Sequence, residues 1–228
     1  EGGAAVVHAR RGYRGRVDGV RGPVGGRHLV AHAHQLGLGT GKAGGALRRR
    51  EETGGRGAPE LADAAAHDGP VYLRFGRSEV PVFTTPDTPF AIGKALTLWQ
   101  PEGGAKPKVA ILGTGSMSYN ALAAARALHA DGIEAVVIHV PTVQPLDEAA
   151  IVSAAREAGR VITVEEHQVA GGFGSAVAEL LARKCPVPME FIGIQDEFGQ
   201  SGNPDELIEH YGLAAAHIAE VARRLIGA

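Results

Sequence analysis

The sequence contains one cysteine, Cys185, among its 228 residues. A single thiol cannot form an internal disulfide framework, and so low a cysteine content is typical of proteins in a reducing cytoplasm. No apolar run approaches the ~20 residues that a membrane-spanning helix needs, and the first residues do not resemble a signal peptide. The formal net charge of −2 provides no overall attraction to nucleic acid or to a membrane surface. We therefore expect a cytoplasmic protein that binds neither.

Large apolar side chains are scarce in the first part of the chain. Residues 1–67 contain no isoleucine, a single aromatic residue (Tyr13) and 16 of the 33 glycines, with eleven basic residues against six acidic ones. Residues 68–228 contain all the isoleucines, the other aromatic residues, and twelve basic against nineteen acidic residues. Since no helical or alternating apolar pattern persists over residues 1–58, this segment cannot bury enough apolar area to offset its ordering entropy. We predict a disordered leader there.

A basic arm that binds nucleic acid is the alternative for this leader, because Arg48, Arg49 and Arg50 form a cationic run. No aromatic residues accompany the run to stack on bases, which disfavours that function. His28, His32 and His34 could suggest a metal site, but no cysteine or acidic residue lies beside them at ligand spacing.

Regular patterns begin near Pro59. A short helix over 59–67 and a strand over 71–75 precede a proline-rich segment, 78–107, which we interpret as a linker containing one modest element between Phe90 and Trp99. From Lys108 onward, apolar strands alternate with amphipathic helices. The predicted strands cover 109–112, 135–140, 161–164 and 189–194, and the predicted helices cover 117–130, 147–158, 175–184, 204–212 and 214–226. The pattern predicts an α/β fold with a doubly wound parallel sheet in a domain spanning 108–228.

Two strand ends carry groups that could perform chemistry. Residues 113–116 (Gly-Thr-Gly-Ser) could hold a phosphate on their amides, but they match neither G-x-G-x-x-G nor a Walker loop and are interpreted as a structural turn. Glu165, Glu166 and His167 follow the strand at 161–164 and could form an acid–base set. No nucleophile is evident at suitable spacing. We therefore interpret these side chains, with Gly171, Gly172 and Gly174, as a structural or interface motif.

Two further positions follow strand ends. Phe198 lies between acids and glycines in the stretch that contains Gly199, Ser201 and Gly202, where it could dock into a partner's pocket or pack onto its own core. Arg77 follows the strand at 71–75 and could bind a phosphate or carboxylate bidentately, with a solvated arginine as the alternative.

Several of these stretches together, in their order and spacing, resemble the C-terminal part of transketolases, and above all the split kind whose two halves are separate chains. The matching stretches are residues 69–77, 141–147, 165–174, 196–202 and 211–213. Deoxyxylulose-phosphate synthase and the beta subunits of 2-oxoacid dehydrogenases share some of these motifs, so a tail of either enzyme stays an alternative.

This resemblance implies the transfer of a two-carbon ketol unit between sugar phosphates in the pentose phosphate pathway, with thiamine diphosphate and a divalent metal such as Mg²⁺. It implies that residues 108–228 are the C-terminal domain and that residues 59–77 are a remnant of the pyrimidine-binding domain. Arg77 matches the arginine that binds the sugar phosphate. The implied partners are an N-terminal transketolase subunit and further copies in a dimer or larger oligomer.

The chain departs from the family before Asp68. The metal-binding Gly-Asp-Gly…Asn motif and the cofactor-activating glutamate have no match in the sequence. We therefore expect that the chain does not bind the cofactor or the metal alone and is not catalytic alone. Our hypothesis is that residues 1–58 are an out-of-frame start joined to a transketolase tail. A non-catalytic dimerisation or interaction module, or a gene fragment, is the alternative.

Overall fold

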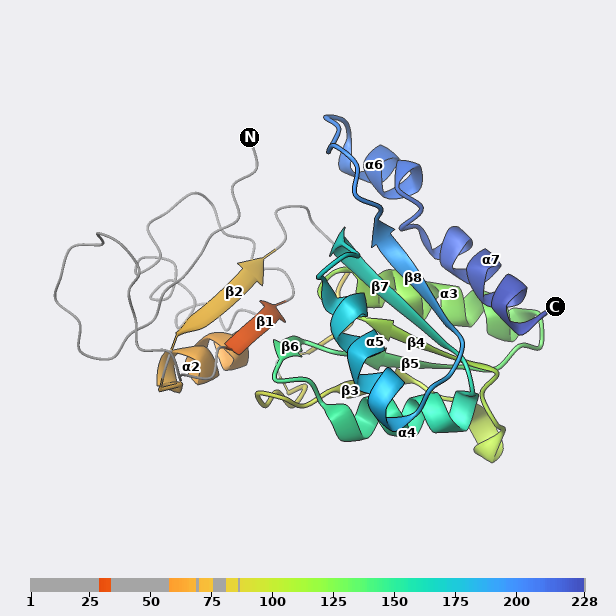
Figure 1. Cartoon of the computed structure of the whole chain (residues 1–228), viewed down its shortest axis with the longest axis horizontal. Helices are drawn as coiled ribbons and strands as arrows, with labels where there is room; N and C mark the ends of the chain where they lie inside the picture. Colours follow the sequence, from red (N-terminus) through yellow and green to blue (C-terminus); the bar gives the residue numbers. More distant parts are fainter. Residues whose placement is uncertain (1–28, 34–57, 69, 76–80, 86, 228) are drawn as a thin grey trace, which may run out of the picture.

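The computed structural model describes residues 29–33, 58–68, 70–75, 81–85 and 87–227. Their helices and strands form a five-stranded sheet covered by helices and a smaller three-stranded sheet at its side (Figure 1). The larger unit contains β3 (Leu96–Trp99), η1 (Glu102–Gly104), β4 (Val109–Gly113), α3 (Met117–Ala130), β5 (Ala135–His139), α4 (Glu148–Ala158), β7 (Val161–Gln168), α5 (Phe173–Lys184), β8 (Met189–Ile194), α6 (Pro204–His210) and α7 (Ala215–Ile226). The smaller sheet contains β1 (Leu29–Ala33), β2 (Val71–Phe75) and β6 (Thr142–Gln144), with α2 (Ala58–Ala66) beside it.

The five-stranded sheet has the order β3-β5-β4-β7-β8. The four strands from β5 to β8 are parallel to one another, and β3 pairs antiparallel with β5 at one edge. Every residue of β4 and β5 is buried, as expected for parallel strands covered on both faces. The predicted α/β fold with a parallel sheet is therefore confirmed.

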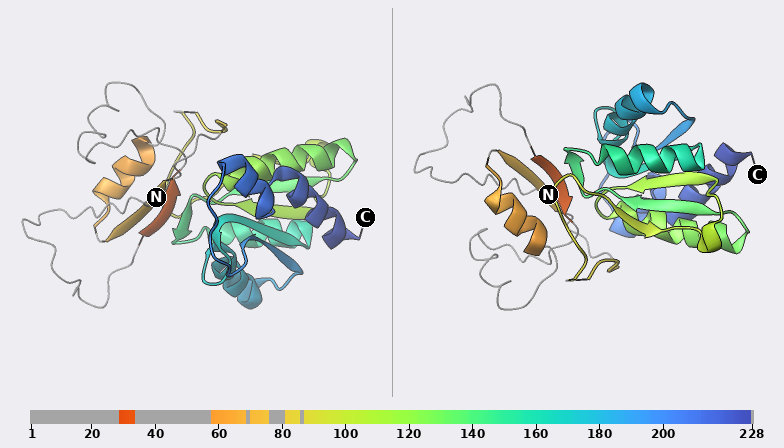
Figure 2. Two further views of the ribbon diagram at one scale, coloured as in Figure 1. Left: turned by 90° about the horizontal axis from the view of Figure 1, so that it is seen from above. Right: turned by 90° about the horizontal axis from the view of Figure 1, so that it is seen from below.

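Alternation along the central strands directs side chains into two apolar clusters, one on each face. Ile111 of β4 packs in a cluster with α3 and α7, whereas its neighbour Leu112 packs in a second cluster with α4 and α5. The two further views show these helix pairs on opposite sides of the sheet (Figure 2).

Local sequence signals set the ends of two helices. The Asp147 side chain accepts a hydrogen bond from the Ala150 amide at the start of α4, and Gly159 ends that helix in the left-handed region with φ 71°. Asn203 caps α6 through the Asp205 amide, directly before Pro204 at the first helical position.

The three-stranded sheet has the order β2-β1-β6, with β1 parallel to β2 and antiparallel to β6. The strand β1 lies inside the segment for which we predicted a disordered leader, and for these five residues that prediction is wrong. The physical reason is long-range pairing, since β1 lies between two strands that come much later in the chain. The other residues of the predicted leader lie outside the described residues.

Three predicted boundaries also shift. The predicted linker contains β3, which belongs to the five-stranded sheet, and η1. Strand β7 continues to Gln168 because its pairing with β8 resumes there, where Gln168 pairs with Ile194. Helix α5 begins at Phe173 rather than at the predicted Ser175. Within the described part of the chain, no helix has the length and apolar character needed to cross a membrane.

Candidate functional site

Glu165 lies in β7, where the strand passes from its buried apolar half to its exposed polar end. Its side chain is 1% exposed. One carboxylate oxygen accepts a hydrogen bond from the Phe173 amide and the other from the Gly174 amide, each at 2.7 Å. These amides belong to the first turn of α5, where Gly172 has no side chain to act as a cap. Glu165 therefore supplies the cap from a neighbouring strand, and its negative charge lies at the positive end of the helix.

The glycines beside Glu165 allow this close approach. A Cβ atom at Gly172 would lie 2.3 Å from a Glu165 oxygen and 2.3 Å from the Gln168 carbonyl oxygen. A Cβ atom at Gly174 would lie 2.7 Å from the Thr163 hydroxyl oxygen. Gly171 has φ +76°, a conformation that favours glycine. The glycine motif thus brings the start of α5 onto the end of β7.

Burial raises the pKa of the Glu165 carboxyl above its ordinary value, although the hydrogen bonds from Gly174 and Phe173 act in the opposite direction. The half-exposed His167 ring lies 3.9 Å from this carboxylate, and its Nδ1 is 2.9 Å from the Gln168 carbonyl oxygen. The nearby Ser175 hydroxyl donates to the Val169 carbonyl and accepts from the Gly171 amide. Each of these groups has a structural partner, and their arrangement does not form a nucleophile with its base.

Glu166 connects three parts of the molecule. Its carboxylate accepts a hydrogen bond of 2.9 Å from the Ser116 hydroxyl, and its backbone carbonyl accepts one of 2.6 Å from the Arg74 guanidinium. Ser116 directly precedes α3, and Arg74 belongs to β2 of the smaller sheet. The carboxylate therefore lies at the helix start where the 113–116 turn could have held a phosphate, and its backbone joins the two sheets.

The carboxyl ends of the neighbouring strands are also held by internal contacts. The buried His139, at the end of β5, lies with its Nδ1 2.6 Å from the Ser118 hydroxyl and contacts the Phe83 ring edge to face. Asp147 accepts a hydrogen bond from the Ala95 amide besides its capping contact in α4. Of the described residues, no group of three or more His, Cys, Asp and Glu side chains is placed to hold a metal ion.

The sequence left two alternatives for Phe198, and the structure separates them. Its side chain is 99% exposed, so it does not pack onto its own core. The loop over residues 195–203, which connects β8 to α6, is nevertheless fixed at both ends. Gln168 donates to the Asp196 carboxylate at 3.3 Å, and the Tyr211 hydroxyl accepts from the Gln200 amide at 2.8 Å.

The sequence analysis included Arg74, Ser116 and Tyr211 in stretches that it singled out, but it assigned none of them a contact at this edge. A charged residue inside the otherwise apolar strand 71–75 was the one signal that could have singled out Arg74. Arg77, His28 and His34 lie outside the described residues, so the functions predicted or excluded for them stay predictions.

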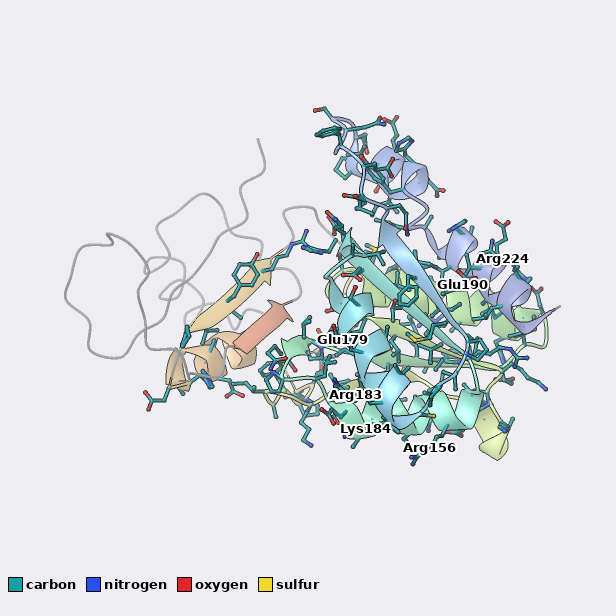
Figure 3. The ribbon with its side chains drawn as sticks, viewed as in Figure 1. Arg156, Glu179, Arg183, Lys184, Glu190 and Arg224 are labelled. Carbon is teal, nitrogen blue, oxygen red and sulfur yellow. The ribbon has the colours of Figure 1, made fainter. Side chains whose placement is uncertain are left out.

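The other prominent charges lie on the helices that cover the sheet. Figure 3 labels Arg156, Glu179, Arg183 and Lys184 on α4 and α5, together with the ion pair between Glu190 and Arg224, whose atoms are 3.7 Å apart. Lys184 pairs with Glu148. Exposed ion pairs such as these contribute little to stability, and they lie away from the end of β7.

Comparison with known proteins gives one consistent family. Residues 102–218 match the family described as "Transketolase, C-terminal domain". The chain is 44% identical over 160 residues to the 6-deoxy-6-sulfo-D-fructose transketolase subunit SqwH of Clostridium sp. (strain MSTE9), covering 70% of this chain and 48% of that protein. It is 41% identical over 173 residues to the 1-deoxy-D-xylulose-5-phosphate synthase of Heliobacterium modesticaldum, covering 74% of this chain and 26% of that one.

The fold is also similar to that of a solved structure described as "Split gene transketolase, inactive beta4 tetramer". The TM-score is 0.72 at 33% sequence identity, and the match covers 88% of this chain and 58% of that chain. The chain thus spans about half the length of the transketolase subunit that it matches.

Proposed function

Because the chain belongs to the transketolase family and carries its C-terminal domain, we propose that it is the C-terminal section of a two-chain transketolase and works with a separate N-terminal subunit. The similarity to a transketolase subunit and to a split-gene transketolase supports this proposal. The complete enzyme transfers a two-carbon ketol unit between sugar phosphates.

The division of labour within the complex is inferred from the structural use of the acidic groups at the carboxyl edge of the sheet. Enzymes of this family use thiamine diphosphate and a divalent metal. Among the described residues, the buried Glu165 and Asp147 cap α5 and α4, and no group of three or more His, Cys, Asp and Glu side chains is placed to hold a metal ion. In this proposal the acidic groups of this chain have structural roles, and the cofactor and the metal are bound by the N-terminal subunit or across the complex.

Calorimetry with thiamine diphosphate and Mg²⁺ tests this division of labour. The chain alone, the N-terminal subunit alone and an equimolar mixture are titrated separately, and the mixture is assayed for ketol transfer. We expect no binding by this chain alone and activity only in the mixture. Cofactor binding by this chain alone would contradict our interpretation of the edge. A mixture that binds the cofactor but has no activity would favour a non-catalytic interaction module.

A second candidate function is that of a deoxyxylulose-phosphate synthase tail, which the 41% identity to such an enzyme favours. The two functions differ in the donor substrate. The assembled complex is therefore offered a ketose phosphate or pyruvate in separate assays with the same acceptor. Turnover of the ketose phosphate supports the transketolase function, whereas turnover of pyruvate alone supports the second candidate.

We also propose that Arg77 binds the phosphate of the sugar, as the resemblance implies. Arg77→Ala in the assembled complex should raise KM for phosphorylated sugars about tenfold or more, because loss of a charge-assisted hydrogen bond costs about 1.5–3 kcal/mol. Steady-state kinetics measures the effect. Arg156→Ala, on the exposed face of α4, is the matched control that also removes one guanidinium. An unchanged KM for Arg77→Ala would remove this residue from the substrate site.

A further inference from the structure

Strand β2 ends at the junction between the two sheets, where a charged side chain fastens it to the larger unit. The Arg74 guanidinium donates from Nη1 to the Glu166 backbone carbonyl at 2.6 Å, across 92 positions of sequence. Figure 1 shows the carboxyl ends of β2 and β7 pointing toward this junction. Hydrogen bonds from a charged donor are stronger than those between neutral groups. The end of β2 is therefore attached to β7 by a strong contact.

The part of β7 that receives this contact is itself held in place. Glu165 caps α5 through two backbone amides, and the Glu166 carboxylate accepts a hydrogen bond of 2.9 Å from the Ser116 hydroxyl, directly before α3. The carbonyl that Arg74 binds thus lies in a segment connected to the starts of two helices. Because this acceptor has little freedom to move, it can define the position of the strand that binds it.

Arg74 is better suited to hold the strand than to bind a substrate phosphate itself. Its guanidinium contacts a segment that carries two carboxylates, those of Glu165 and Glu166, and these would repel an anion beside it. Burial raises the pKa of the Glu165 carboxyl, and the charge of Arg74 is among the influences that lower it. The positive charge of Arg74 is therefore compensated within the protein.

The end of β2 also limits where the next arginine of the sequence can lie. Arg77 comes two positions after Phe75, the last residue of β2, and lies outside the described residues. Three residues of extended chain span about 11 Å at most, so the Cα atom of Arg77 stays within that distance of the Cα atom of Arg74. A misplacement of about 1 Å in a group that orients a substrate can cost on the order of 100-fold in rate.

We propose that Arg74 is a positioning residue, which holds the end of β2 on the Glu166 carbonyl so that Arg77 meets the phosphate of the sugar. This inference rests on the proposed function and on the role proposed there for Arg77. Arg74 acts only through Arg77 and contacts neither the substrate nor the cofactor. Its loss should therefore weaken binding of the phosphate end of the substrate and leave the chemistry at the carbonyl end unchanged.

A double-mutant cycle in the assembled two-chain complex tests this role. Arg74→Ala, Arg77→Ala and the double variant are assayed with a ketose phosphate and with an unphosphorylated ketose as the ketol source. We expect Arg74→Ala to raise KM for the ketose phosphate about tenfold, while kcat and the KM for the unphosphorylated ketose stay within about twofold of the wild type. In the Arg77→Ala background, Arg74→Ala should have no further effect, because the group that it positions is absent.

Arg160→Ala is the matched control. Arg160 also donates from its guanidinium to a distant backbone carbonyl, that of Leu225 at 3.1 Å, but it lies directly before β7, at the opposite end of that strand. Its KM for both ketoses should be unchanged. Melting temperatures are measured for every variant. If Arg74→Ala is unstable, Arg74→Lys and Arg74→Met replace it, because lysine keeps a charged hydrogen-bond donor and should retain most of the affinity, whereas methionine fills similar space without one and should not.

Three results would overturn the positioning role and leave the proposed function standing. They are an unchanged KM in Arg74→Ala, an equal rise in KM for both ketoses, and effects of Arg74→Ala and Arg77→Ala that add in the double variant. If Arg77→Ala leaves KM unchanged, the role of Arg74 fails together with that of Arg77, while ketol transfer by the complex still supports the proposed function. If the wild-type complex transfers no ketol unit, the proposed function and this inference both fail.

Discussion

The five-stranded sheet lies between two large apolar clusters, whereas the three-stranded sheet has a separate cluster of which the described side chains are Ala64, Val71 and Leu73, with the partly buried Ile92 beside them. The smaller sheet is also connected to the larger unit at both of its edge strands. Strand β6 follows β5 directly in the chain, and Arg74 of β2 donates to Glu166 at the end of β7. The comparison indicates that the larger unit is stable through its own core, while the smaller one is held in place through its contacts with that unit.

A pair of matched substitutions tests this difference and should give the largest effect. Leu112 (0% exposed) lies in a large cluster, and Leu73 (2% exposed) lies in the separate one. Leu112→Ala should reduce the free energy of unfolding by about 2–5 kcal/mol, as buried leucine truncations do. Leu73→Ala should change the main transition much less, because Leu73 lies outside both clusters of the five-stranded sheet. Urea unfolding followed by circular dichroism measures both, and equal losses would contradict the comparison.

The sequence allowed most of the larger unit to be predicted and little of the smaller one. Strands β4 and β5 are continuous apolar runs, and α4 and α6 begin at an aspartate and an asparagine that cap them. Such signals are local, so they can be recognised without knowledge of the fold. Strand β1 was missed because it pairs with strands that lie far along the chain, and such pairing leaves no local signal in the sequence.

The same distinction applies to the candidate site. The motif around Glu165 could be recognised because its glutamates, histidine and glycines lie close together in the sequence. Its contacts were not predictable, since Arg74 is 92 residues and Ser116 is 50 residues away from Glu166. The exposure of Phe198 could not be predicted either, because the same loop sequence is compatible with a ring that packs onto its own domain. Local patterns identify such groups, but only the fold shows which groups they meet.

A second test addresses Glu165 by its dependence on pH. Burial raises the folded-state pKa of this carboxyl, so the folded chain binds the proton more tightly than the unfolded chain. Its contribution to stability is therefore fully present below the unfolded pKa and is lost as the pH rises through the raised folded pKa. Glu165→Gln removes this dependence, and it also costs about 1 kcal/mol near neutral pH because the amide group offers one acceptor oxygen instead of two.

The measurement is urea unfolding of the wild type and the variant between neutral pH and the ordinary pKa of the carboxyl. The stability of the wild type relative to Glu165→Gln should increase as the pH falls. Glu179→Gln, on the exposed side of the helix α5 that Glu165 caps, is the control and should show no such trend. A difference that stays constant, or one that decreases toward low pH, would show that the pKa of Glu165 is not raised in the folded chain.

The smallest effect on overall stability is expected from removal of residues 1–55, which deletes β1. The five-stranded sheet contains no residue of this segment, so the melting temperature should stay nearly unchanged. The smaller sheet should respond differently, because β1 lies between β2 and β6 and pairs with both of them. Hydrogen exchange should therefore show loss of protection for amides of β2 and retained protection for those of β4. A fall of many degrees would show that the two units are stabilised together, whereas unchanged exchange in β2 would show that its order does not require β1.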